Sequence, residues 1–221
     1  EKGLSINTSI VPVEWKDSKI NFIDTPGYFD FIGEVNAALR ASEAAVILVD
    51  AGHGGADSGM IGVDGLKEKG INLEISVKLK KVLEKRGYTI LMTREEDKGL
   101  YEENTKNMKA QDLQNRIAMI KEYKPLLAVS IHQNSFTEEK YRGAQVFYYG
   151  PSERSRGLAA SIQQALIEFQ DPDNTRQEKA NEDYYLLRKE TVPTVICECG
   201  FMSNAAEEAL LKSEMYQEKT A

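Results

Sequence analysis

From residue 45 onward, short runs of aliphatic residues alternate with longer stretches in which apolar residues recur every three or four positions. The short runs predict buried strands, and the longer stretches predict amphipathic helices. The predicted strands cover residues 45–49, 88–93, 126–131, 144–149 and 194–197. The predicted helices cover residues 68–86, 110–123, 155–169 and 205–212, and the polar segment 171–183 is expected to be a loop. This alternation predicts an α/β fold with a twisted, mostly parallel sheet flanked by helices.

The N-terminal segment follows a different pattern. Residues 10–15 and 19–23 predict two strands, and residues 30–39 predict a helix. We therefore expect two parts: a short ββα appendage, residues 1–44, and a larger domain, residues 45–221.

Composition excludes several classes of function. The chain has 221 residues, 41% of them hydrophobic, which is enough for one sizeable core. Its formal net charge of −7 argues against nucleic acid as a partner, because phosphate binding requires a basic surface. No apolar run approaches the ~18 residues of a membrane span, and no signal peptide is recognisable. We interpret Cys197 and Cys199, which alternate along a predicted strand, as small buried residues rather than metal ligands.

Four ionisable side chains are predicted to meet at one edge of the sheet. His53 follows the strand 45–49, and His132 directly follows the strand 126–131. Glu198 ends the strand 194–197, and Glu68 opens the helix after the His53 loop. Ligands of open α/β sheets bind beyond the carboxyl ends of the strands, where these residues are expected. Both histidines of the chain belong to this set.

Two imidazoles and a carboxylate are a known catalytic zinc set whose fourth position is open to water. We therefore predict that His53, Glu68 and His132 bind Zn2+, and that Glu198 accepts and returns a proton. Each residue alone has an ordinary interpretation. A histidine after a strand can be a hydrogen-bonded loop residue, Glu68 can be an acid favoured by the helix dipole, and Glu198 can be a loop carboxylate. Their joint placement at one edge makes the metal site an equal alternative to these ordinary interpretations.

The glycines around His53 do not form a nucleotide-binding motif. The segment GHGGADSG lacks the third glycine of the dinucleotide fingerprint. The glycines of GGADSGMI have P-loop spacing, but Met60 and Ile61 stand where lysine and serine or threonine are required.

The motifs around these residues resemble the zinc-dependent N-acetylmuramoyl-L-alanine amidases, in particular the germination-type enzymes of spore-forming Firmicutes. In chain order they are VILVDAGHGGADSGMIG, DLQNRIAMI, AVSIHQNS, GAQVFYY and YYLLRKETVPTVICECGFMSN. The resemblance covers residues 45–217 and implies one zinc held by His53, Glu68 and His132, with Glu198 as the catalytic glutamate. The family usually continues its last helix beyond the point that Ala221 reaches, so the C-terminal helix is expected to be truncated.

The same resemblance implies the substrate. It is the amide bond between the lactyl group of N-acetylmuramic acid and the L-alanine of the stem peptide in peptidoglycan, of the cell wall or the spore cortex. Asn134 is a candidate substrate-binding residue, and a loop cap is its alternative. Arg176 and Lys179 match a basic spot in the family and are candidates for contact with stem-peptide carboxylates, whereas a solvated loop is the alternative. An extracytoplasmic location is expected from the family, and whether a regulatory protein partner is needed stays open.

Residues 1–50 resemble a fragment of a different family, the translational GTPases of the elongation factor G type. The motif DTPG, Asp24 to Gly27, matches the one that contacts magnesium and the γ-phosphate in those proteins, and AVILVDA fits both families. The chain is therefore interpreted as a fusion whose junction lies inside a shared strand. The sequence contains no P-loop lysine and no Asn-Lys-x-Asp motif, so the fragment is expected to be non-functional. A GTP-binding fragment and a catalytically inactive peptidoglycan-binding module are the alternative functions.

Overall fold

The computed structural model describes residues 9–15, 18–24, 46–102 and 104–221. The chain divides into two compact units, Glu1–Ala45 and Val46–Ala221, and each is described by itself. No helix among these residues is long and apolar enough to cross a membrane.

The N-terminal unit contains a pair of antiparallel strands. They are β1 (Ser9–Trp15) and β2 (Ser18–Asp24), with Ser9 opposite Asp24 and Trp15 opposite Ser18. Both predicted strands of the appendage are thereby confirmed. The predicted helix at residues 30–39 lies outside the described residues.

The larger unit is built on a six-stranded sheet with the strand order β4-β3-β5-β8-β6-β7. All neighbouring strands are parallel except β6 and β8, which run antiparallel. The strands are β3 (Val46–Ala51), β4 (Thr89–Met92), β5 (Leu127–Asn134), β6 (Gln145–Tyr148), β7 (Lys179–Ala180) and β8 (Thr194–Phe201). The predicted mostly parallel sheet is confirmed.

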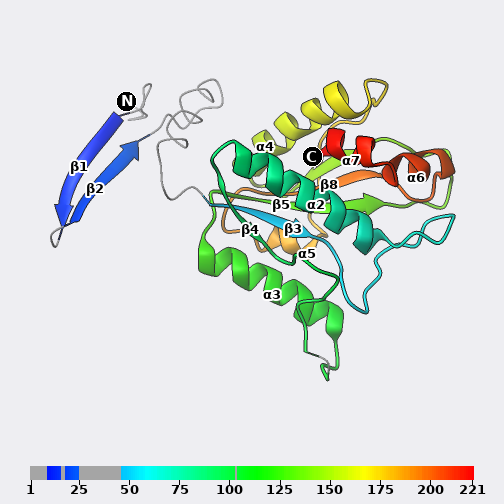
Figure 1. Ribbon diagram of the computed structural model, residues 1–221, viewed down its shortest axis with the longest axis horizontal. Coiled ribbons are helices and arrows are strands. Elements are labelled where there is room, and N and C mark those ends of the chain that lie inside the picture. The colour runs from blue at the N-terminus through cyan, green and yellow to red at the C-terminus, as the bar shows by residue number, and fades with distance from the viewer. Residues whose placement is uncertain (1–8, 16–17, 25–45, 103) are drawn as a thin grey trace. The chain divides into compact units, whose positions relative to one another are not determined.

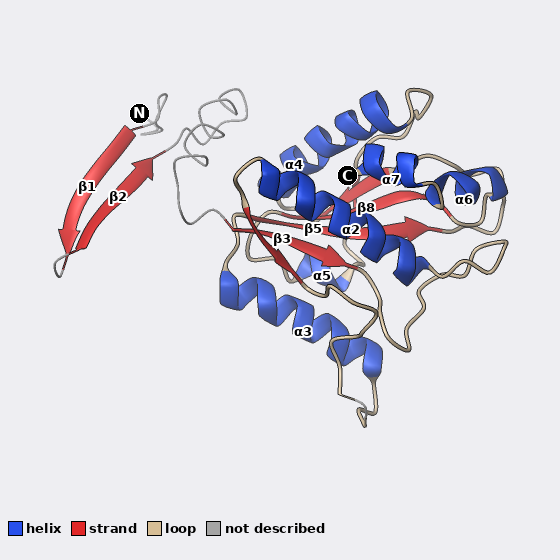
Figure 2. Cartoon of the chain, viewed as in Figure 1, coloured by secondary structure: helices blue, strands red, loops and turns tan. Residues whose placement is uncertain are grey.

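Helices cover both faces of this sheet (Figures 1 and 2). One face carries α2 (Glu68–Lys85), α4 (Glu153–Ala165), α6 (Ala205–Leu211) and α7 (Glu214–Thr220). The other face carries α3 (Met108–Tyr123) and α5 (Tyr185–Arg188). The architecture is a three-layer α/β/α arrangement, as an alternation of strands and helices requires.

The period of two along β8 distributes its side chains between the two faces. Val195, Cys197 and Cys199 belong to the apolar cluster under α2 and α4. Ile196 belongs to the cluster under α3 and α5, and Glu198 shares that side of the strand. Both cysteines are free and buried, which confirms their interpretation as core residues.

Two strands extend beyond their predicted ends, and this moves two site residues into the sheet. His132 lies within β5 and not after it, because β5 continues to Asn134. Glu198 lies within β8, which continues to Phe201. The added residues of β5 are polar, and those of β8 include a glutamate and a glycine. The aliphatic pattern therefore ends before each strand does. The two residues face each other as Cα partners of the parallel β5–β8 ladder.

Smaller differences concern the helices and the loop. The helix predicted at 155–169 begins at Glu153 and ends in a π-helical segment, η2 (Leu166–Gln170). The loop predicted at 171–183 contains the two-residue strand β7. The short helix α5 lacks the length that reveals a periodicity, and α7 was not predicted either. In α7, Tyr216 and Gln217 are buried.

Candidate metal centre

His53 lies two residues beyond the end of β3, in a sharply turned loop. Its φ angle is +60°, a left-handed conformation that is uncommon for a residue other than glycine. Its Nδ1 atom lies 2.8 Å from Oδ2 of Asp57, which leaves Nε2 to point away from this loop. A carboxylate on one ring nitrogen fixes the orientation of the ring and makes the other nitrogen a better metal ligand.

Glu68 is the first residue of α2, and its side chain is only 2% exposed. Oε1 accepts hydrogen bonds from Nδ2 of Asn72 and the backbone N–H of Gln133, both at 3.1 Å. Oε2 accepts one from the backbone N–H of Met60 at 2.8 Å. The carboxylate is therefore held from the helix, from β5 and from the loop before the helix.

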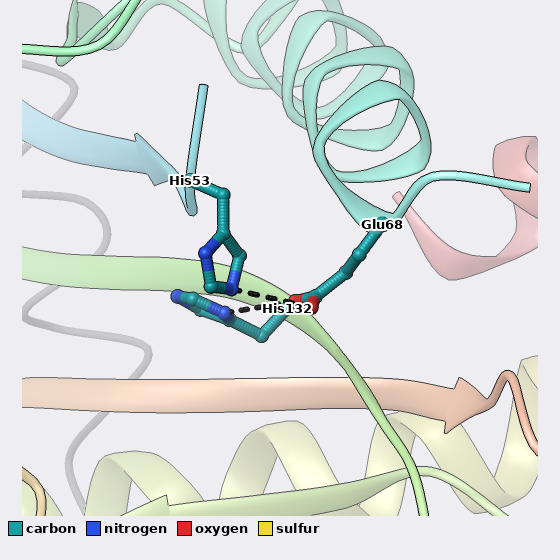
Figure 3. Close-up of side chains that lie close together, drawn as sticks. All are labelled: His53, Glu68 and His132. Carbon is teal, nitrogen blue, oxygen red and sulfur yellow. Dashed lines mark hydrogen bonds and ion pairs between the residues drawn. The ribbon is translucent and has the colours of Figure 1, made fainter. Parts of the chain in front are cut away.

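The three predicted ligands meet at one point (Figure 3). Nε2 of His53 lies 3.2 Å from Oε2 of Glu68, and Nδ1 of His132 lies 3.0 Å from Oε1. One ligand atom from each residue lies within 4.8 Å of the other two. Bonds of about 2.0–2.2 Å around a tetrahedral centre place ligand atoms roughly 3.4 Å apart, so these side chains fit a zinc ion with little movement.

Two glycines make this close approach possible. A Cβ atom on Gly52 would lie 2.2 Å from Cε1 and 2.3 Å from Nε2 of His132. A Cβ atom on Gly59, whose φ is +66°, would lie 2.4 Å from Oε2 of Glu68. The His132 ring thus packs against Gly52, and Nδ1 is the ring nitrogen that faces Glu68.

The charges of the group are strongly coupled. Burial acts to raise the pKa of Glu68, but hydrogen bonds with His132 and His53 hold this pKa well below its usual range. Burial acts to lower the pKa of His53, but Glu68 and Asp57 raise it to about 9. A buried carboxylate that stabilises positive charge on the imidazole of His53 can stabilise a divalent cation in the same place, after the proton has left.

Glu198 lies on the neighbouring strand beside this group. It is 7% exposed, and burial raises the pKa of its carboxyl group, although His132 acts in the opposite direction. Oε1 accepts a hydrogen bond of 3.3 Å from the hydroxyl of Tyr184. Oε2 is buried and has no hydrogen-bond partner among the described residues.

A cavity of about 200 Å³ opens between these groups and the α3/α5 side of the sheet. His53, His132 and Glu198 line this cavity, and Leu113, Leu186 and Ile196 supply apolar walls. Lys109 on α3 also lines it and lies 3.7 Å from the carboxylate of Asp57. A substrate group in this cavity would therefore contact the candidate metal site and the buried carboxyl of Glu198 together.

Comparison with known proteins identifies the family to which the chain belongs. A sequence profile described as N-acetylmuramoyl-L-alanine amidase matches residues 47–221, nearly all of the larger unit. The chain belongs to the N-acetylmuramoyl-L-alanine amidase family. The germination-specific N-acetylmuramoyl-L-alanine amidase of Bacillus subtilis is 37% identical over 179 residues, which are 80% of this chain and 75% of that protein.

Solved structures agree with this assignment. The CwlD amidase from Clostridioides difficile, solved in complex with the GerS lipoprotein, superposes on this amidase with a TM-score of 0.78. It shares 41% sequence identity, over 80% of this chain and 92% of that one. The amidase AmiC2 of Nostoc punctiforme gives a TM-score of 0.70 at 27% identity, over 81% of this chain and 92% of that one.

The N-terminal residues of the amidase match a second profile. The elongation factor Tu GTP binding domain covers residues 1–83 and overlaps the amidase match at residues 47–83. In the structure that overlap forms β3, the His53 loop and most of α2, which belong to the amidase sheet and its covering helix. The similarity to a translational GTPase fragment is thus confirmed, and the interpretation of the chain as a fusion stays a prediction.

Three further residues were predicted to bind substrate, and none of them lines the cavity. Oδ1 of Asn134 accepts a hydrogen bond of 2.8 Å from the N–H of Ser135. The guanidinium of Arg176 donates to the carbonyl of Arg142 and to Gln145, and it lies 4.5 Å from the centroid of the Phe201 ring. Lys179 lies exposed on β7.

The sequence did not reveal the residues that contact and support the predicted site residues. Asp57 lies four positions after His53 in the same loop, and this short spacing is a signal that could have identified it. Arg116 and Tyr184 come from distant segments, and only the fold brings them to the site.

Proposed function

We propose that this amidase is zinc-dependent, with His53, Glu68 and His132 as metal ligands and Glu198 as the catalytic acid and base. Its reaction is hydrolysis of the bond between the lactyl group of N-acetylmuramic acid and the L-alanine of the stem peptide. The observation that supports this most directly is the placement of one ligand atom from each of three distant residues within 4.8 Å of the others. A buried carboxyl group that is not part of the trio lies on the adjoining strand.

Zinc in a site with three protein ligands lowers the pKa of water to about 7 and polarises a carbonyl oxygen. In this proposal Glu198 takes a proton from the attacking water and returns it to the departing amine nitrogen of L-alanine. Its burial suits this cycle, because a raised pKa lets a carboxyl group hold and release a proton nearer to neutral pH. Asp57 keeps Nε2 of His53 directed at the metal position.

The proposed substrate is the peptidoglycan of the cell wall or the spore cortex. The name of the Bacillus subtilis relative supports a role in germination. An extracytoplasmic location is part of this proposal, because peptidoglycan is the proposed substrate. The lipoprotein complex of the Clostridioides difficile neighbour supports a protein partner for this amidase as well. Asn134, Arg176 and Lys179 stay predictions for contacts with the rest of the substrate.

The test is zinc content together with a muropeptide digest. Purified protein should contain about one zinc per chain, and the digest should release free stem peptides. Glu198→Gln should keep its zinc and lose turnover by a factor of 10²–10⁴, the usual contribution of a positioned acid–base group. Glu153→Gln, which changes a glutamate 84% exposed on α4, is the matched control. Metal-free protein that cleaves peptidoglycan at full rate would refute the zinc-dependent reaction.

Two alternatives give different results in the same experiments. A catalytically inactive binding module would retain peptidoglycan on sedimentation and release no peptide. A GTP-binding fragment, which the match at residues 1–83 brings into consideration, would give heat on titration with GTP. We expect no heat, because the sequence lacks the P-loop lysine and the guanine-binding motif.

A further inference from the structure

Tyr184 lies on the wall of the cavity, immediately before α5. Its hydroxyl donates to Oε1 of Glu198 at 3.3 Å. Its ring meets the ring of Phe147 edge to face, with centroids 5.6 Å apart and planes at 88°. The phenol therefore reaches the catalytic carboxyl group from a ring that is packed on the core.

The backbone of Tyr184 is fixed as well as its ring. Oδ1 of Asn181 accepts hydrogen bonds from the N–H groups of Asp183 and Tyr184, at 2.8 and 2.9 Å. The N–H of Asn181 in turn donates to the carbonyl of Tyr148 at the end of β6. This chain of contacts connects the segment 181–184 to the sheet, so the hydroxyl is in position before any substrate binds.

The two oxygens of Glu198 have different surroundings. Oε1 has the Tyr184 hydroxyl, whereas Oε2 is buried with no hydrogen-bond partner in the described part of the chain. The last torsion of a glutamate side chain has broad wells, so little in the side chain itself fixes how its carboxyl group is turned. One hydrogen bond to Oε1 is then enough to decide which oxygen is available for proton transfer.

We propose that Tyr184 is a positioning residue for the amidase reaction, whose hydroxyl holds Oε1 of Glu198 and so fixes the orientation in which this carboxyl group meets the attacking water. The inference rests on the proposed role of Glu198. As the water oxygen bonds to the carbonyl carbon, its proton passes to the carboxylate of Glu198. When the carbon–nitrogen bond breaks, the same proton passes to the nitrogen of the leaving L-alanine, and Glu198 is returned to its starting form.

Tyr184 neither gains nor loses a proton in the cycle. Its burial, followed by the nearby charge of Glu198, raises the pKa of the phenol, which favours the donor form.

The experiment compares Tyr184→Phe with Tyr148→Phe in the zinc-loaded protein. Both variants lose a single hydroxyl and keep the ring, and Tyr148 is packed on the opposite, α4 side of the sheet. For Tyr184→Phe we expect kcat to fall about tenfold while KM and zinc content stay at wild-type values. Tyr148→Phe should match the wild type.

A crystal structure of Tyr184→Phe supplies a readout that does not depend on rate. We expect the Glu198 carboxyl group to turn or to occupy two orientations, while the metal ligands superpose on those of the wild type. An unchanged kcat, a change in KM alone, or a single unchanged orientation of Glu198 would each overturn the inference. Glu198→Gln in the same assay separates this failure from a failure of the proposed function, because an active Glu198→Gln protein removes the acid–base role itself.

Discussion

Arg116 on α3 donates a hydrogen bond of 2.8 Å from Nη2 to the backbone carbonyl of His53. Its side chain is 3% exposed, and the same guanidinium also contacts Asp50, Asp112 and the carbonyl of Ala51. The left-handed backbone of His53 is thus held by a buried cation on its carbonyl as well as by the loop. A non-glycine residue in this conformation persists only where its surroundings stabilise it.

Replacing Arg116 with lysine tests this support. An ammonium group keeps the charge but has no planar fork that reaches both carboxylates and both carbonyls. We expect Arg116→Lys to fold and to melt at a lower temperature. We also expect it to bind zinc roughly 10-fold more weakly, which is the lower end of the loss in metal affinity seen when a residue that supports a metal ligand is removed. Isothermal titration with zinc measures the affinity. Arg156→Lys, at an arginine 58% exposed on α4, is the control, and equal zinc affinity in both variants would show that the His53 carbonyl contact is dispensable.

Gly52→Ala is predicted to damage the metal site with little effect on the rest of the fold. The added methyl group would lie 2.2 Å from the His132 ring, so the imidazole must shift from its present position beside Glu68. We expect at least a tenfold loss of zinc affinity and a matching loss of activity at low zinc concentrations.

Gly70→Ala is the matched control for that substitution. A Cβ atom on Gly70, within α2, would meet nothing within 4 Å. Alanine should therefore stabilise the helix by about 0.5–1 kcal/mol and leave zinc binding unchanged. If Gly52→Ala binds zinc as tightly as Gly70→Ala, the close packing of Gly52 on His132 does not matter for the site.

Asp57→Ala tests the carboxylate behind His53. The substitution removes the 2.8 Å contact to Nδ1 and leaves the ring free to rotate. Loss of such a partner typically costs 10–100-fold in metal affinity, and we expect a zinc dissociation constant raised within that range. Competition with a chromophoric chelator gives the constant. Asp173→Ala, at an exposed turn, should not change it, and an Asp57→Ala protein with wild-type affinity would contradict the proposed role.

The sequence predicted the strands and helices best where burial alone selects the residues. The aliphatic run of β3 and the apolar stripe of α2 were recognised because each faces the core over most of its length. The predicted strands ended just before His132 and Glu198, although β5 and β8 continue past these residues. The side chains of His132 and Glu198 line the cavity, so they do not continue the aliphatic pattern of the core. Chain order could also place both histidines at one edge of the sheet, since parallel strands end together.

The surrounding contacts could not be predicted in the same way. Arg116 and Asp50 are charged residues whose burial depends on each other, and the hydrophobic pattern gives no sign of that pairing. Tyr184 and Tyr185 are adjacent and chemically identical. Only the orientation that the turn at Asn181 gives to the chain decides that Tyr184 is the one whose hydroxyl reaches Glu198.

The buried pair of Asp50 and Arg116 predicts an acid-dependent loss of stability. Burial acts to raise the pKa of Asp50, but the charge of Arg116 and a hydrogen bond from Ser130 lower it from 3.8 to about 2. The unfolded chain therefore binds the proton more tightly than the native protein does. The stabilisation is complete above pH ~4–5 and is lost as the pH falls toward 2, and a shift of this size corresponds to roughly 2 kcal/mol.

Urea unfolding of the metal-free protein between pH 7 and pH 2 measures this loss, with Asp50→Asn as the comparison. At neutral pH we expect Asp50→Asn to be about 3 kcal/mol less stable, the lower end of the cost of breaking a buried ion pair, because Arg116 loses one carboxylate partner and keeps Asp112. The free-energy difference between the two proteins should shrink by roughly 2 kcal/mol as Asp50 becomes protonated in the wild type. A difference that stays constant down to pH 2 would mean that Asp50 does not have the lowered pKa on which the prediction depends.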